Sequence, residues 1–174
     1  QRMMTMIQRE RLIQTFLELV QLDSESKFER PVADYTAAKL RALGYEVKED
    51  NANANTGGNA GNIIAYKPGN VEGKTVMFCS HMDTVPPGCG VKPIVDGDII
   101  RTDGTTVLGG DDKAGVAEIM TALEKLLTED IPHGKVAFAF TPDEEIGSGM
   151  EDFDTDAFGA KYAYTLDGAG FGEI

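Results

Sequence analysis

The chain has 174 residues, of which 41% are hydrophobic and 26% are charged, and its formal net charge at pH 7 is −13. This length suffices for one domain with its own core, and no apolar run approaches the ~20 residues of a membrane-spanning helix. The acidic balance argues against nucleic acid as a partner, because phosphate binding needs clustered lysine and arginine, and it suits a protein that holds cations.

The first elements are two helices and a short strand. A broad apolar face predicts a helix over residues 5–22, which the polar residues 23–26 end. Pro31 suits the first turn of a second helix, and Gly44 suits its C-terminal cap. The alternating residues 45–47 predict a short, half-exposed strand.

The middle of the chain is predicted to contain a loop, two strands and a hairpin. Residues 50–61 have few large apolar side chains, and their asparagines and glycines favour turns, so we expect a surface loop. Residues 62–66 and 74–80 are predicted strands, and the continuous apolarity of the second is typical of a strand covered on both faces. Residues 91–108 contain two Asp-Gly turn signals and predict a β-hairpin. Their aspartates lack EF-hand spacing, which argues against a calcium loop.

A long helix and two strands complete the prediction. Residues 116–127 carry apolar side chains at helical spacing. Asp111 and Asp112 therefore lie at the start of a helix, where unpaired backbone N–H groups favour negative charge. A helix cap explains one of these adjacent carboxylates, whereas a metal ion would explain both. Residues 135–140 and 161–166 are predicted strands.

The element order indicates an α/β fold, and four segments place acids or a histidine directly after an apolar run. These residues are His81 with Asp83, Asp111 with Asp112, Glu144 with Glu145, and Asp167. In open α/β sheets, ligands bind beyond the C-terminal ends of the strands. The four segments can therefore converge on one site.

Each group also has a plainer interpretation when it is taken alone. His81 and Asp83 lie two positions apart on an extended chain and point the same way, but they could be a surface histidine beside a capping aspartate. An acidic pair such as Glu144 and Glu145 is more often a solvated turn, and Asp167 before Gly168 is more often a plain turn. Asp111 alone is equally consistent with a helix cap and with a metal ligand. Together, the groups favour a metal site, because carboxylate oxygens with one imidazole suit Zn²⁺, Mn²⁺ or Co²⁺.

Other chemistries lack their motifs. No Gly-x-Ser-x-Gly sequence is present, and neither Cys79 nor Cys89 has an obvious base partner. The glycines complete no phosphate-binding motif. His133 lies between Pro132 and Gly134, so we expect it to be structural or exposed. The first residues lack the apolar stretch of a signal peptide, which favours reduced cysteines in the cytoplasm.

Four ordered motifs resemble the M20 metallopeptidases, and among them the peptidase T-like tripeptide aminopeptidases. The motifs are HMDTVP at 81–86, GDDKAG at 110–115, TPDEEIG at 141–147 and YTLDG at 164–168. The resemblance extends from about residue 7 to the end of the chain. It implies a zinc-peptidase-like catalytic domain, a three-layer αβα sandwich with a mostly parallel, mixed central sheet.

The resemblance also implies a ligand set for two divalent metal ions. His81 and Asp167 would hold one ion, Glu145 would hold the other, and Asp111 would bridge them. Family members often have a cis peptide after the bridging aspartate, here between Asp111 and Asp112. Zinc is the expected metal, with manganese or cobalt as alternatives.

The implied activity is removal of the N-terminal residue from short peptides. Asp83 would orient His81, and Glu144 would be the general base that activates a metal-bridging water. The alternatives are an M20 amidohydrolase or deacylase that cleaves a non-peptide amide, and a catalytically inactive metal-binding domain.

The family pattern continues beyond this chain, which ends seven residues after Asp167. We therefore expect residues 1–174 to be the N-terminal portion of the catalytic domain, without the lid or dimerisation domain and the C-terminal catalytic segment. The second metal site would be incomplete, because its histidine comes from that segment, and the chain should bind one ion better than two. If the protein forms a homodimer, the missing domain would provide the contact.

Overall fold

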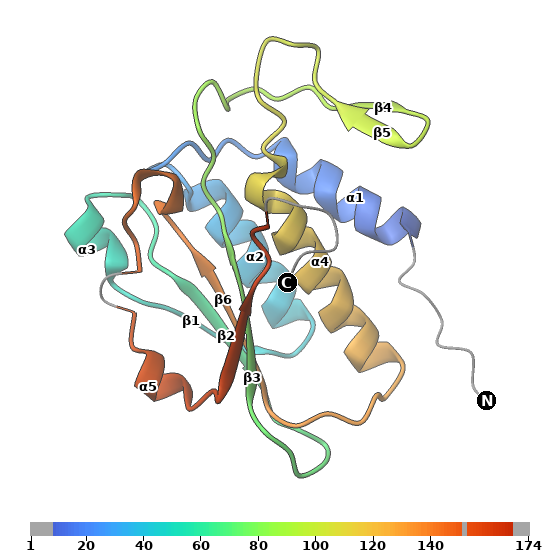
Figure 1. Ribbon diagram of the computed structural model, residues 1–174, viewed down its shortest axis with the longest axis vertical. Helices are drawn as coiled ribbons and strands as arrows, with labels where there is room; N and C mark the ends of the chain where they lie inside the picture. Colours follow the sequence, from blue (N-terminus) through green and yellow to red (C-terminus); the bar gives the residue numbers. More distant parts are fainter. Residues whose placement is uncertain (1–8, 151–152, 169–174) are drawn as a thin grey trace.

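The first two helices lie close to their predicted positions in the computed structural model, which describes residues 9–150 and 153–168 (Figure 1). Helix α1 (Arg9–Val20) covers most of the first predicted helix, and residues 5–8 of that prediction lie outside the described residues. Helix α2 (Arg30–Ala42) has proline in its first turn. It ends where Gly44 adopts a left-handed conformation and donates its N–H to the Arg41 carbonyl at 2.9 Å.

The segment between the first two strands is more ordered than expected. Strands β1 (Glu46–Glu49) and β2 (Ile63–Lys67) flank a one-turn helix, α3 (Ala52–Thr56), where we predicted only a loop. The reason is the Asp50 carboxylate, whose Oδ1 accepts hydrogen bonds from the N–H of Ala52 at 3.0 Å and of Asn62 at 2.8 Å. One side chain thus binds the first N–H of the short helix and ties the two ends of the segment together.

The central sheet is mixed, which confirms the predicted α/β fold. Its other strands are β3 (Val76–His81), β6 (Val136–Thr141) and β7 (Tyr162–Thr165), and the order is β1-β2-β6-β3-β7. The pairs β1/β2 and β2/β6 are antiparallel, and the pairs β3/β6 and β3/β7 are parallel. Within this five-stranded sheet of the described residues, two pairings are therefore parallel and two are antiparallel.

Strand β6 lies at the centre of the sheet and is buried along its whole length. Phe138 and Phe140 face the larger core, which α1, α2 and α4 (Gly110–Thr128) cover. Figure 1 shows these three helices packed together against the strands. Ala137 and Ala139 face a smaller core with Phe153, just before the short helix α5 (Thr155–Phe158). Within residues 9–150 and 153–168, the helical cover on this second face of the sheet is the segment of Phe153 and α5.

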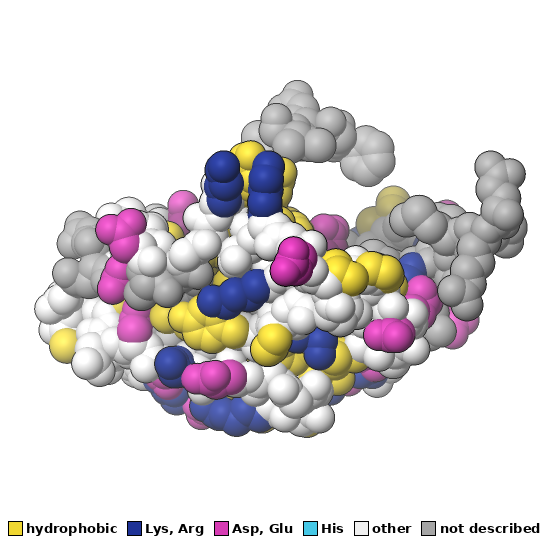
Figure 2. Space-filling model, turned by 90° about the horizontal axis from the view of Figure 1, so that it is seen from below, with side chains coloured by type: hydrophobic (Ala, Val, Ile, Leu, Met, Phe, Trp, Pro, Cys, Tyr) yellow, Lys and Arg dark blue, Asp and Glu magenta, His cyan; other side chains and the backbone are white. Residues whose placement is uncertain are grey.

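The end of the sheet where β3, β6 and β7 begin carries lysines packed on tyrosines. Lys135 Nζ lies 4.8 Å from the ring centroid of Tyr66, and Lys74 Nζ lies 5.1 Å from that of Tyr162. Figure 2, which views the molecule from below, shows such basic side chains beside hydrophobic ones. His133 lies at this end, and its backbone N–H donates to Asn70 Oδ1 at 2.8 Å. Its ring Nδ1 lies 2.7 Å from the Gly134 carbonyl oxygen, so of the two predicted roles, structural or exposed, the structure favours the structural one.

The predicted hairpin is confirmed as a separate two-stranded sheet. Strands β4 (Ile94–Asp96) and β5 (Ile99–Arg101) pair antiparallel across a turn in which Gly97 has a φ of 62°. Figure 1 shows the hairpin above α1 and the start of α4, at the end of the molecule opposite to the lysine-bearing surface. None of the described helices combines the length and apolar character that crossing a bilayer requires.

Candidate metal centre

The parallel strands β3, β6 and β7 bring three of the predicted segments to one edge of the sheet, and the start of α4 adds the fourth. Strands β3 and β6 are parallel, with His81 beside Thr141, so the residues after both strands leave the sheet at the same end. Ligand atoms of His81, Asp111 and Glu145 lie within 4.8 Å of one another, and so do those of His81, Glu144 and Asp167. Side chains separated by up to 86 positions therefore share one site.

His81 is the centre of this arrangement and is only 2% exposed. Its Nδ1 lies 3.0 Å from the Asp83 carbonyl oxygen and 3.2 Å from Asp83 Oδ1. Its Nε2 faces the other acids, 3.0 Å from Asp111 Oδ1 and 3.8 Å from Glu144 Oε2. Burial by itself lowers the pKa of His81, but hydrogen bonds with Asp83 and Asp111 outweigh it and raise the pKa to about 9. The ring therefore sits in a strongly negative environment, which also favours a cation at Nε2.

Asp83 has two tasks, of which the sequence indicated only one. Besides contacting His81, it accepts hydrogen bonds from the backbone N–H of Glu144 at 3.0 Å and of Glu145 at 3.1 Å. Ser26 Oγ donates a further bond at 2.8 Å. Burial would raise the pKa of Asp83, but the hydrogen bond with His81, and then those from Ser26 and the two backbone N–H groups, hold it below its usual value. An ionised Asp83 thus fixes both the imidazole and the turn that carries the two glutamates.

The glutamates lie on a short 3₁₀ turn, η1 (Glu144–Ile146), directly after β6. The turn begins at Asp143, which is fully buried and left-handed, with a φ of 58°. Its N–H donates to Oε1 of the buried Glu29 at 3.0 Å. Burial, and then the charge of Asp143, raises the pKa of Glu29 to about 7. Sequence analysis missed Glu29 and Ser26, because neither follows an apolar strand.

The adjacent aspartates at the start of α4 point to different environments. The peptide bond between Asp111 and Asp112 is cis, as the resemblance implied, and both residues have non-helical backbone angles. The Asp111 side chain is 71% exposed at the site. Asp112 is buried, and its Oδ2 accepts a hydrogen bond from Ser80 Oγ at 2.6 Å. Burial raises the pKa of Asp112 to about 7. The pair therefore divides into one accessible acid and one interior acid.

The donor set fits a divalent cation. It offers one imidazole nitrogen and the carboxylates of Asp111, Glu144, Glu145 and Asp167, and both Cys79 and Cys89 are free and lie outside it. Burial, and then the nearby charge of Asp111, raises the pKa of Glu145, which shows how closely the acids crowd. Within the described part of the chain, no lysine or arginine forms an ion pair with these carboxylates. Oxygen and imidazole ligands without thiolate suit Zn²⁺, Mn²⁺ or Co²⁺.

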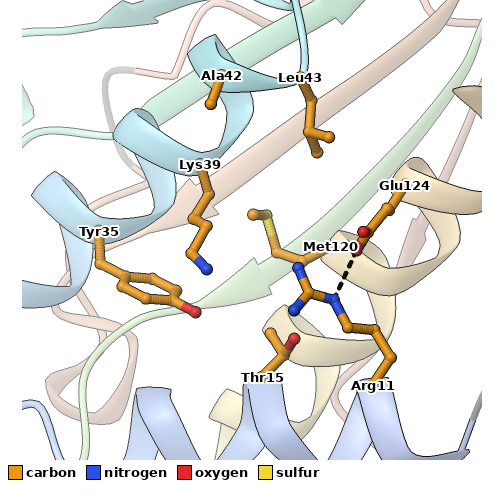
Figure 3. Close-up of a pocket in the computed structure, with 8 residues that line it drawn as sticks. All are labelled: Arg11, Thr15, Tyr35, Lys39, Ala42, Leu43, Met120 and Glu124. Atoms are coloured by element: carbon orange, nitrogen blue, oxygen red, sulfur yellow. Dashed lines mark hydrogen bonds and ion pairs between the residues drawn. The ribbon is translucent and has the colours of Figure 1, made fainter.

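A cavity of about 170 Å³ between α1, α2 and α4 is a different feature (Figure 3). Arg11 and Lys39 point into it from opposite helices. Arg11 Nε bonds Glu124 at 2.8 Å, and Lys39 Nζ bonds Glu18 at 3.3 Å. Its charged groups already have partners, and it contains none of the candidate metal ligands.

Comparisons with known proteins identify the family of the chain. Residues 77–170 match the sequence profile of the family described as Peptidase family M20/M25/M40. The uncharacterized protein YqjE of Bacillus subtilis (strain 168) is 45% identical over 166 residues, covering 95% of this chain and 45% of that protein. Peptidase T of Salmonella enteritidis PT4 is 41% identical over 202 residues, covering 95% and 49%. The chain thus spans about half the length of these relatives.

Two solved structures have nearly the same fold over the described region. Aminopeptidase PepT from Bacillus cereus ATCC 10987 is 46% identical and superposes with a TM-score of 0.92. A tripeptidase (SAV1512) from Staphylococcus aureus subsp. aureus Mu50 is 40% identical, with a TM-score of 0.91. In each case the match covers 95% of this chain and 45% of the other.

Proposed function

The chain belongs to peptidase family M20/M25/M40, and on this premise we propose that it forms part of a metallo-aminopeptidase that removes the N-terminal residue from short peptides. The observation that carries the proposal is the convergence of one imidazole and four carboxylates at a single edge of the sheet. The names of the similar proteins, peptidase T, aminopeptidase PepT and tripeptidase, support tripeptides as the substrate class.

The proposed ligand assignment is the one that the family resemblance implies, and its four residues lie in the cluster around His81. His81 and Asp167 would hold one ion, Glu145 would hold the second, and Asp111, whose Oδ1 is 3.0 Å from His81 Nε2, would bridge them. When bound, such ions lower the pKa of a water molecule and stabilise negative charge that develops on the substrate carbonyl oxygen. Asp83 occupies the Nδ1 side of His81 and so leaves Nε2 for the metal.

Glu144 is proposed as the general base. Its side chain is 47% exposed, so a water molecule and a peptide can reach it, and its Oε2 lies 3.8 Å from His81 Nε2. A carboxylate in this position can take the proton of the attacking water and deliver it to the leaving amine. The hydrogen bond from the Glu144 N–H to Asp83 keeps Glu144 next to the proposed metal ligands.

The decisive experiment is a hydrolysis assay of the full-length protein with three substrates: a tripeptide, the same tripeptide acetylated at its N-terminus, and an N-acetylated amino acid. We expect hydrolysis of the free tripeptide alone, loss of activity with a chelator, and recovery on adding Zn²⁺, Mn²⁺ or Co²⁺. Hydrolysis of the acetylated amino acid in place of the tripeptide would show an amidohydrolase instead. A protein that takes up metal but cleaves no substrate would be a metal-binding domain only.

A further inference from the structure

Gly115, one turn into α4, lies in close contact with backbone and side-chain atoms directly behind the proposed metal ligands. A Cβ atom at this position would lie 2.6 Å from the carbonyl oxygen of Leu166 and 2.5 Å from Asp112 Oδ1. Real Cβ atoms essentially never make such contacts. Gly115 has no left-handed backbone conformation, so glycine is required here by the neighbouring atoms and not by φ.

Asp112 connects Gly115 to two ligand-bearing segments. Its Oδ1 accepts a hydrogen bond from the Gly115 N–H at 3.1 Å, and its Oδ2 lies 2.6 Å from Ser80 Oγ. The Ser80 hydroxyl also lies 3.0 Å from the Asp112 carbonyl oxygen. Ser80 immediately precedes His81, and Asp112 immediately follows Asp111. The buried Asp112 carboxylate therefore ties the end of β3 to the start of α4, one residue behind each ligand.

Leu166 brings the third segment to the same point. Its N–H donates to the Cys79 carbonyl at 2.9 Å, which continues the pairing of β7 with β3 beyond the strand. Its carbonyl oxygen then packs on Gly115, and Asp167 is the next residue. The separation between the α4 segment and the Asp167 segment is thus set by a contact that only a glycine permits.

We propose that Gly115 is a positioning residue for the metal centre, which fixes the distance between the Asp111 and Asp167 ligands through Asp112 and Leu166. The inference rests on the proposed function. Metal–ligand distances tolerate deviations of only about 0.2 Å. An ordinary contact between Cβ and the Leu166 oxygen begins at 3.4 Å, so alanine would displace this carbonyl by about 0.8 Å or push Asp112 away. Either movement exceeds the tolerance of the ligands.

The test compares Gly115→Ala with Gly69→Ala in the full-length protein. A Cβ atom at Gly69 would lie 2.6 Å from the Gly134 carbonyl carbon, so the steric strain is similar, but Gly69 lies in the turn that contacts residues 133–134, at the opposite end of the sheet. We expect Gly115→Ala to weaken zinc binding by about 10- to 100-fold in a calorimetric titration. We also expect it to change the visible spectrum of the Co²⁺-loaded protein. Gly69→Ala should lower the thermal midpoint and leave both readouts unchanged.

Ser80→Ala is a second variant that keeps the hypothesis testable if Gly115→Ala does not fold. It removes only the hydroxyl that holds Asp112 and should shift the cobalt spectrum in the same sense. If Gly115→Ala and Ser80→Ala bind zinc as tightly as Gly69→Ala and give the wild-type spectrum, Gly115 has no positioning role. That result would leave the proposed function intact, whereas a wild-type protein that binds no metal would overturn both.

Discussion

Replacing Asp83 with asparagine tests whether one buried carboxylate organises the whole site. Asp83 is fully buried and accepts hydrogen bonds from Ser26 Oγ and from the N–H groups of Glu144 and Glu145, besides contacting His81. Asparagine has the same shape but carries no charge, and one of its two terminal groups donates instead of accepting. At least one backbone N–H of the glutamate turn therefore loses its acceptor in Asp83→Asn.

The expected cost follows from these contacts. A hydrogen bond to a charged group contributes about 1.5–3 kcal/mol, and a buried donor without an acceptor costs about 1–3 kcal/mol more. We therefore expect Asp83→Asn to lower the free energy of unfolding by about 3–5 kcal/mol, the range found when one partner of a buried charged contact is removed. Because the His81 ring also loses its charged partner, zinc affinity should fall about 10- to 100-fold.

The assay is urea unfolding in the presence of a chelator, so that metal binding contributes nothing to stability, followed by a zinc titration of the refolded protein. Glu144→Gln is the matched control, because it makes the same acid-to-amide change on the turn that Asp83 holds, but on a side chain that is 47% exposed. Its free energy of unfolding should change by less than about 0.5 kcal/mol. If Asp83→Asn unfolds at the same urea concentration as this control, the proposed role of Asp83 is wrong.

Three further outcomes are expected. Glu144→Gln should keep zinc affinity within a few-fold while turnover of a tripeptide falls about 10²- to 10⁴-fold, and near-normal hydrolysis would remove Glu144 from the base role. Adding a chelator should abolish turnover and lower the thermal midpoint of unfolding, because the bound metal stabilises the folded state. An unchanged midpoint after removal of the metal would show that the metal does not stabilise the fold. Glu29 has a folded pKa of about 7, above the 4.5 of an unperturbed glutamate, so its stabilising contribution is complete below pH 4.5 and is lost as the pH rises through 7. The metal-free Glu29→Gln variant should therefore be more stable than the metal-free wild type at pH 8, by up to about 3 kcal/mol, and this difference should shrink toward pH 5. Equal free energies of unfolding at pH 8 would refute the raised pKa of Glu29.

Much of the fold could be predicted from the sequence, because helices and covered strands follow from local apolar spacing. The prediction was wrong for residues 50–61, where a short helix replaces the expected loop. The Asp50 carboxylate accepts hydrogen bonds from the N–H of Ala52, the first residue of this helix, and from the N–H of Asn62, twelve positions away from Asp50. Composition alone does not reveal such a bond, since asparagine and glycine suit a loop equally well.

The candidate site, like the fold, was predicted only in part from the sequence. That acids and a histidine follow apolar runs is visible in the sequence. The parallel strands β3, β6 and β7 and the start of α4 bring them together. The sequence does not show that Asp83 holds the glutamate turn with help from Ser26, 57 positions earlier. It also gives no sign that Glu29 supports the same turn from the interior.

The sequence by itself determined the chemical groups of this protein, their order, and the strands and helices that carry them, because each of these depends on neighbouring residues. Only the tertiary structure decided the direction of each group. Asp111 faces the site and Asp112 the interior, because Ser80 of strand β3 binds Asp112 and not Asp111. The contact of Gly115 with Leu166 likewise arises from the packing of a helix on a strand end. Such distances are set by the register of strands and by packing across the core, which no local pattern of residues records.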